Sequence, residues 1–189
     1  ALVDIHLSSH HALNRMTSAT AIVPEGVPGP FPVLYLLHGL SDDHTAWTRR
    51  TSLERYVQEY PLMVVMPDGG RGWYSDSITD PRAAYETFIT RDLIGFVDRT
   101  FHTIPSREGR VICGLSMGGY GALKLGLKHP DLFNAAVSFS GALGFDEQFD
   151  VDEEIIAELR AILGDDLRGG PEALPVIAYS VVLLSLYRR

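Results

Sequence analysis

One serine of this chain lies in a setting that would make it a nucleophile. Ser116 is the centre of the segment GLSMG at 114–118, which fits the pattern G-x-S-x-G, and Gly119 follows directly. The segment stands between an apolar run and a helix-like run, and the sharp turn at such a junction projects the serine oxygen into solvent. Glycines leave room for the neighbouring backbone at this turn. The pattern predicts attack of Ser116 on a carboxylic ester or thioester, through an acyl-serine intermediate.

The tetrahedral oxyanion formed by that attack needs two hydrogen-bond donors. The amide of Met117 is the first candidate, because it opens a helix whose N-terminal amides favour negative charge. The second is expected from the loop His38-Gly39-Leu40 after an earlier apolar run, with the amide of Leu40 as the best candidate. Glycines in such a motif can also serve only close packing of a helix on a strand. The apolar run, the loop and the Gly-Gly pair together favour a nucleophile elbow.

The elements that must hold these residues alternate between strand and helix. Strands are expected at 17–23, 31–39, 62–70, 110–115, 134–140 and 176–187, and helices at 45–58, 83–101, 117–128 and 151–163. Parallel strands need crossovers of this length, so the pattern predicts a mostly parallel sheet with helices on both faces. Chemistry in such sheets gathers at the carboxyl ends of the strands, which here are the segments 38–40, 67–73 and 114–119.

Composition limits the partners of the protein. The chain has 189 residues, which suits one domain, and a formal net charge of -8 with a pI near 5.3. An acidic surface argues against nucleic acid or an anionic membrane as the main partner. The lone cysteine, Cys113, cannot form an intrachain disulfide and favours a reducing, cytoplasmic location. The apolar segment 176–187 is too short for a membrane-spanning helix, and no residue spacing indicates a metal or a nucleotide cofactor.

Four segments together resemble the Putative esterase family of α/β-hydrolases. They are LLHGLSDDHTAW, MVVMPDGGRGWYSDS, VICGLSMGGYGALKLGLKHPDLF and AAVSFSGAL, and the resemblance runs from about residue 14 to about residue 165. Within the family, the chain looks most like the small tributyrin-type esterases and the S-formylglutathione hydrolases. The resemblance implies an α/β-hydrolase fold and ester or thioester hydrolysis without a cofactor.

The resemblance also implies roles for individual residues. They are Ser116 as the nucleophile, Leu40 and Met117 as the oxyanion donors, and His38, Trp73 and Tyr74 at the substrate. In this arrangement His38 orders the oxyanion loop, and the two aromatic residues line the substrate mouth. Packing in the core or rim is an equally open role for Trp73 and Tyr74. Asp68, in the segment PDGG, is expected as a turn residue rather than as a catalytic acid.

The chain departs from the family in the rest of its catalytic triad. In α/β-hydrolases an acid and then a histidine follow the serine. The only histidine after Ser116 is His129, thirteen residues on, which is about 20 Å away along a helix. A general base must lie within about 3 Å, or one water, of the proton that it takes. His129 is therefore too far from Ser116 to be the general base. His38 remains a minor candidate for a substitute base, and His44 and His102 are weaker candidates.

The triad acid is missing as well, since no acidic residue after Ser116 follows a late strand and the resemblance ends at about Gly170. We expect one α/β-hydrolase domain over 1–189, with a short cap-like insert at 145–170 and a truncated C-terminal part. The expected function is that of a serine carboxylesterase acting on a small-molecule ester. The alternatives are an acyltransferase on the same machinery and a catalytically impaired binding protein that lacks the triad Asp and His. The apolar segment 176–187 would favour a homo-oligomer.

Overall fold

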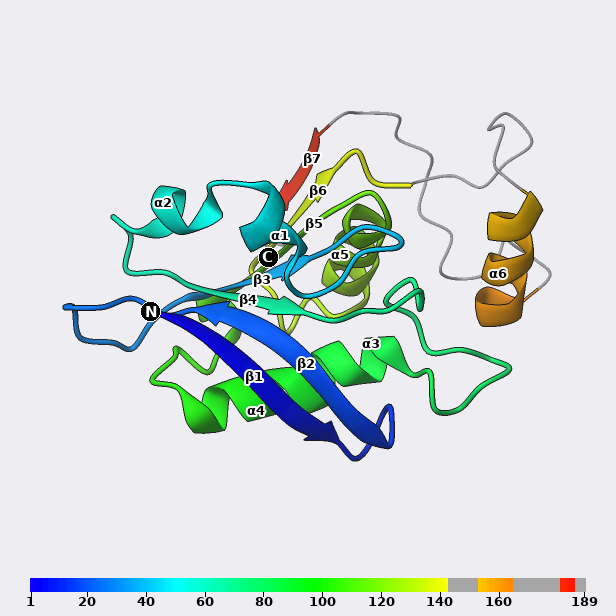
Figure 1. The fold of residues 1–189 in the computed structure, drawn as a ribbon, viewed down its shortest axis with the longest axis horizontal. Coiled ribbons are helices and arrows are strands. Elements are labelled where there is room, and N and C mark those ends of the chain that lie inside the picture. The colour runs from blue at the N-terminus through cyan, green and yellow to red at the C-terminus, as the bar shows by residue number, and fades with distance from the viewer. Residues whose placement is uncertain (143–152, 165–180, 186–189) are drawn as a thin grey trace.

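A seven-stranded sheet forms the centre of the computed structural model, which describes residues 1–142, 153–164 and 181–185 (Figure 1). The strands are β1 Leu2–Ser9, β2 Arg15–Ile22, β3 Val33–Leu37, β4 Met63–Pro67, β5 Arg110–Leu115, β6 Ala135–Phe139 and β7 Val181–Ser185. They lie in the order β1-β2-β4-β3-β5-β6-β7. The central strands β4, β3, β5 and β6 are parallel, whereas β1, β2 and β7 pair in antiparallel fashion. The predicted mostly parallel sheet is confirmed at its centre, and its two sides are antiparallel.

Helices cover both faces of this sheet, as predicted. They are α1 Ala46–Arg50, α2 Leu53–Val57, α3 Tyr85–Thr87, α4 Ile94–Thr100, α5 Met117–Lys128 and α6 Glu153–Leu163, with a π-helical turn η1 at Phe88–Leu93 and a 3-10 turn η2 at Arg107–Gly109. Successive strand side chains point to opposite faces. Tyr35 of β3 and Ile112 of β5 therefore join a large apolar cluster with α4 and α5. Leu36 and Cys113 of the same strands join a smaller cluster with α1 and α2.

The register of the central strands brings the predicted catalytic segments together. Leu37, the last residue of β3, is paired with Gly114 of β5, and the two strands run parallel. The loop after β3 and the turn after β5 therefore leave the sheet side by side at its carboxyl edge. Both strands are continuous apolar runs, which is the pattern required of strands covered on both faces.

Two predicted helices are interrupted. The helix expected at 45–58 is split into α1 and α2, because Thr51 adopts an extended backbone at the end of α1 and its hydroxyl donates to the carbonyl of Trp47. Hydroxyl side chains that bond to nearby backbone in this way compete with helix formation. The helix expected at 83–101 is made of α3, η1 and α4, with the π-helical turn in its middle.

The π-helical turn anchors a hairpin that the sequence did not predict in full. Strand β1 was not expected, and it pairs with β2 along its whole length, from Leu2 to Ser9. At the tip of the hairpin, a carboxylate oxygen of Asp92 in η1 accepts from the Ser9 hydroxyl at 2.6 Å, and the other lies 2.7 Å from Nδ1 of His11. Burial opposes ionisation of Asp92, but these hydrogen bonds outweigh it and lower the pKa of the carboxyl.

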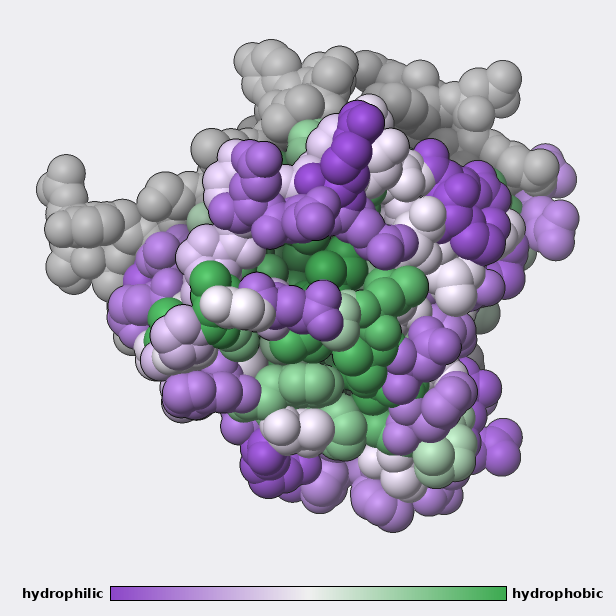
Figure 2. Space-filling view, turned by 60° about the vertical axis from the view of Figure 1, so that its left-hand side comes forward, coloured by the Kyte–Doolittle hydropathy of each residue, from purple (hydrophilic) through white to green (hydrophobic). Residues whose placement is uncertain are grey.

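Some apolar surface remains on the outside of the molecule. Leu34 and Val137, on the face of the smaller cluster, are only half-buried, and Leu115 and Phe139 at the ends of β5 and β6 are exposed. Figure 2 shows a side of the molecule on which apolar residues gather in a hollow framed by hydrophilic ones. Surfaces of this kind can serve in association between proteins. The homo-oligomer stays a prediction.

The predicted insert at 145–170 is described only at 153–164, and the rest of it lies outside the described residues. There, α6 agrees with the predicted helix at 151–163 and ends at Gly164, whose φ of +99° favours glycine. The predicted strand at 176–187 is described as β7, Val181–Ser185. No helix in the described part of the chain is both long and apolar enough to cross a membrane.

Candidate active site

Ser116 occupies a strained turn between β5 and α5. Its backbone has φ 55° and ψ -116°, a conformation that L-residues rarely adopt, and the residue is exposed. Two backbone hydrogen bonds hold the turn: the Ser116 amide donates to the carbonyl of Phe139 at 3.0 Å, and the amide of Tyr120 donates to the carbonyl of Ser116 at 2.9 Å. The serine is therefore held out at the carboxyl edge of the sheet by its two neighbouring strands and its own helix. This is the geometry predicted for a nucleophile elbow.

The glycines of the motif allow this close approach. A Cβ on Gly114 would lie 2.2 Å from the carbonyl oxygen of Gly118, and a Cβ on Gly118 would lie 2.4 Å from the carbonyl oxygen of Leu37. A Cβ on Gly119 would lie 2.6 Å from the hydroxyl of Ser138 on β6. Side chains at these positions would push α5 away from the sheet, and Ser116 would move with the helix. The motif therefore positions the serine as well as the helix.

The loop after β3 lies beside the serine. A Cβ built on Gly39 would be 3.7 Å from the Cβ of Ser116 and 3.5 Å from the carbonyl oxygen of Leu115. Leu40, the predicted second oxyanion donor, follows Gly39 directly. The predicted first donor, Met117, is the first residue of α5, where amides have no partner inside the helix. The geometry thus supports Leu40 and Met117 as oxyanion donors, and their role in catalysis stays a prediction.

His38 supports the oxyanion loop from beneath and is not placed to act as a base. Its side chain is 1% exposed. The amide of Gly69 donates to Nε2 at 2.8 Å, so Nδ1 carries the ring hydrogen and donates to the carbonyl of Gly39 at 2.7 Å. Both ring nitrogens are occupied, so neither is available to take a proton from Ser116. The predicted ordering role fits this geometry, and the surrogate base does not.

The segment after β4 packs against His38. Trp73 is 3% exposed and Tyr74 is 0% exposed, and the Tyr74 hydroxyl donates to the carbonyl of His38 at 3.0 Å. Tyr74 therefore underlies the loop, and the ring of Trp73 packs 5.8 Å from that of Tyr120 on α5. Both positions agree with the packing role left open above, and contact with substrate stays a prediction. Asp68 accepts from the amide of Gly70 at 2.9 Å. That bond makes Asp68 a turn residue, as expected.

His129 is engaged elsewhere, at the far end of α5. Its Nε2 lies 2.9 Å from a carboxylate oxygen of Glu86. The carboxylate of Glu86 also forms ion pairs with Lys124 at 2.9 Å and with Lys128 at 3.1 Å. Burial opposes ionisation of Glu86, but the hydrogen bond with His129 and the charge of Lys124 outweigh it and lower the pKa of Glu86 to about 2. The prediction that His129 cannot be the base is supported by this position.

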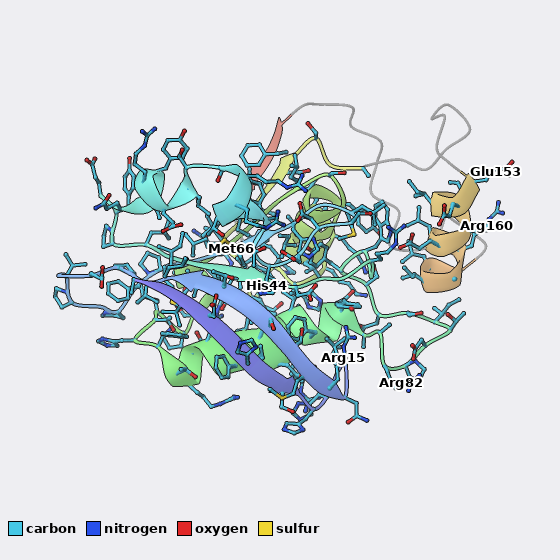
Figure 3. All side chains as sticks on the ribbon, viewed as in Figure 1. Arg15, His44, Met66, Arg82, Glu153 and Arg160 are labelled. Atoms are coloured by element: carbon cyan, nitrogen blue, oxygen red, sulfur yellow. The ribbon has the colours of Figure 1, made fainter. Side chains whose placement is uncertain are left out.

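The other predicted site residues do not complete a triad. His102 lies at the opposite edge of the sheet, because its carbonyl accepts from the amide of Phe31 just before β3. His44 lies in the turn before α1, near the middle of the view in Figure 3. Among the described residues, no hydrogen bond joins the Ser116 hydroxyl to a histidine, and no group of three or more His, Cys, Asp or Glu could hold a metal ion.

One functional candidate was missed by sequence reasoning. Arg71 donates from Nη1 to the hydroxyl of Ser41 at 2.8 Å and from Nη2 to a carboxylate oxygen of Glu158 on α6 at 2.6 Å. Figure 3 shows α6, marked by Glu153 and Arg160, standing at one side of the molecule. An arginine in a polar loop belongs to no periodic pattern, and Arg71 is separated from Glu158 by 87 residues in the sequence. The sequence therefore contains no signal for this pair.

A strand–turn–helix with a strained, exposed serine, on a parallel sheet covered by helices, defines an α/β-hydrolase with a nucleophile elbow. Residues 10–162 match the family described as Putative esterase. Because that match covers most of the chain, the protein belongs to this family. The resemblance inferred from the sequence segments is confirmed.

Curated relatives are esterases and an acyltransferase. Esterase Rv1288 of Mycobacterium tuberculosis is 37% identical over 124 residues, which cover 63% of this chain and 27% of that protein. Diacylglycerol acyltransferase/mycolyltransferase Ag85A of Mycobacterium tuberculosis is 35% identical over 122 residues, covering 59% of this chain and 36% of the relative. The chain thus spans about a third of the length of these two relatives.

Solved structures agree with this assignment. The fluorophosphonate-binding serine hydrolase FphF of Staphylococcus aureus has a TM-score of 0.72 and 29% identity, covering 87% of this chain and 66% of the other. The S-formylglutathione hydrolase FrmB of Staphylococcus aureus has a TM-score of 0.71 and 30% identity, covering 85% of this chain and 67% of the other. The α/β-hydrolase fold is therefore shared well beyond the elbow.

Proposed function

We propose that this chain belongs to a serine carboxylesterase that hydrolyses short acyl esters or thioesters through an acyl-Ser116 intermediate. The observation that carries the proposal is the exposed serine held at φ 55° beside the loop after β3. Strain of this kind is kept where the surrounding structure requires it, and often at functional sites. Support also comes from the family match and from the relatives named as esterases and as an S-formylglutathione hydrolase.

The reaction would begin with attack of the Ser116 oxygen on the acyl carbon. The oxygen of the acyl group would then carry negative charge, which the amides of Leu40 and Met117 would stabilise. Collapse would expel the alcohol or thiol and leave the acyl group on Ser116, and water would release it. Removing one donor of such a pair typically costs about 2.7–4 kcal/mol of transition-state stabilisation.

The proton of Ser116 needs an acceptor, and the histidines described above do not supply one. An elbow with an oxyanion hole but without the acid and base retains a rate enhancement on the order of 10³–10⁴ over water in a well-studied protease. The catalytically impaired binding protein therefore stays as an alternative. An acyltransferase stays as a second alternative, because Ag85A is among the relatives. A cytoplasmic location stays a prediction from the lone cysteine.

A fluorophosphonate probe tests the proposal directly, since it reacts with an activated serine. We expect labelling of the full chain, and its loss in Ser116→Ala. Ser140→Ala is the matched control, because Ser140 is an exposed serine at the end of β6 that also has a positive φ, of 45°. Labelling that is absent in the wild-type chain, or that survives Ser116→Ala, contradicts the proposal. Product analysis of ester reactions with added alcohols separates hydrolysis from acyl transfer.

A further inference from the structure

The oxyanion loop, residues 38–41 after β3, is hydrogen-bonded at both of its ends to the loop that follows β4. At the first end, the amide of Gly69 donates to Nε2 of His38 at 2.8 Å. At the other end, Nη1 of Arg71 donates to the hydroxyl of Ser41 at 2.8 Å. Leu40, whose amide is the proposed oxyanion donor, lies between these two attachments. The position of that amide therefore depends on both contacts.

The attachment at Ser41 supports an unfavourable backbone. Ser41 has a φ of +62°, in the left-handed region that serine rarely occupies. A residue held there persists only when its surroundings enforce it. The hydrogen bond from the charged guanidinium of Arg71 to the Ser41 side chain is such a constraint, because hydrogen bonds from charged donors are stronger than neutral ones. Loss of this bond would free the turn that directly follows Leu40.

The same arginine holds α6. Its Nη2 donates to Glu158 at 2.6 Å, with side chains 48% and 18% exposed respectively. Two further contacts fix the end of the helix. The amide of Ile78 donates to the carbonyl of Ile162 at 3.0 Å, and the hydroxyl of Thr79 donates to the carbonyl of Ala161 at 2.7 Å. The guanidinium thus bridges α6 and the oxyanion loop with two separate nitrogens.

We propose that Arg71 is a positioning residue that ties α6 to the oxyanion loop, so that docking of α6 sets the orientation of the Leu40 amide. The proposal rests on the serine esterase function proposed above. Arg71 acts through Ser41 on the donor that stabilises the transition state. Its loss should therefore lower kcat and leave KM nearly unchanged, because the oxyanion exists only after attack.

The test compares Arg71→Ala, Ser41→Ala and the double variant in the full chain, with 4-nitrophenyl acetate as substrate. We expect each single variant to lower kcat by roughly tenfold, a fraction of the loss of a whole donor. The double variant should be no slower than Arg71→Ala, because both changes break the same hydrogen bond between Arg71 and Ser41. Arg82→Ala is the matched control, since Arg82 is an exposed arginine of the same segment whose ion pair among the described residues is local, with Asp80 at 3.4 Å. Additive losses, or losses confined to KM, would overturn the proposal.

Hydrogen exchange gives a readout that does not need activity. In Arg71→Ala, amides in both 38–44 and 153–163 should exchange faster than in the wild-type chain, whereas Glu158→Ala should release 153–163 and lower kcat less than Arg71→Ala does. Unchanged exchange at 38–44 in Arg71→Ala would refute the link even if the wild-type chain were inactive. Absence of fluorophosphonate labelling in the wild-type chain would instead refute only the esterase function.

Discussion

Substitution of Gly118 by alanine should damage the site more than the fold. The added Cβ would lie 2.4 Å from the carbonyl oxygen of Leu37 and 2.7 Å from that of His38, whereas ordinary contacts begin at 3.4 Å. The start of α5 must therefore move by about 1 Å relative to the loop after β3. A misplacement of that size in a catalytic site can cost about 10²-fold in rate. The change separates the two proposed oxyanion donors, because Met117 lies on α5 and Leu40 on the loop.

We expect Gly118→Ala to slow fluorophosphonate labelling of Ser116 by about 100-fold. Overpacking costs typically 1–3 kcal/mol, which alanine in a helix offsets by about 0.5–1 kcal/mol, so the loss in Tm should be only a few degrees. Gly95→Ala is the matched control in α4, where the neighbour that the Cβ would meet in the described part of the chain is the end of the Arg99 side chain, at 3.0 Å. It should label normally and melt no lower than the wild-type chain. Wild-type labelling of Gly118→Ala would refute the argument that the glycine sets the distance between the two donors.

Two further predictions concern the charged cluster at the far end of α5. The pKa of Glu86 is lowered from 4.5 to about 2, so the ionised carboxylate stabilises the fold fully above pH 4.5 and loses that effect as the pH falls toward 2. Glu86→Gln should therefore lower the free energy of unfolding by about 3 kcal/mol at pH 7, and denaturation at pH 3 should show a smaller difference. His129→Ala should lower Tm but leave the rate of Ser116 labelling unchanged; a drop in labelling with intact folding would mean that His129 reaches the serine.

The residues at the elbow could be predicted because the hydrophobic pattern and the glycine spacing indicated the same geometry. The apolar run before Ser116 predicted β5 at 110–115 and the run after it predicted α5 at 117–128, with the bounds that the structure has. Glycines at 114 and 118 then had one geometric explanation, close approach of the backbone. The loop at 38–40 followed from the parallel pairing of neighbouring strands, which brings their carboxyl ends to one edge of the sheet.

The contacts that support the site could not be predicted in the same way. The link between Arg71 and Glu158 joins two polar side chains across 87 residues, and charged surface residues obey no period. The burial of Trp73 and Tyr74 depends on the path of an irregular segment, which pattern does not give. Strand β1, in contrast, could have been predicted, because its sequence LVDIHLSS alternates between apolar and polar residues and has one exposed face, which is the pattern of a half-buried strand.

The π-helical turn has a consequence for how the hairpin could have arisen or been lost. Such a turn holds one residue more than the α-helical turn that it replaces. With α3 fixed on the sheet, deleting one residue of Phe88–Arg91 would rotate Asp92 and α4 together by about 100° relative to α3. The carboxylate would then face away from Ser9 and His11, and the tip of the β1–β2 hairpin would lose its buried attachment. Deletion of a single codon would therefore release this edge of the sheet as effectively as a substitution that removes the Asp92 carboxylate.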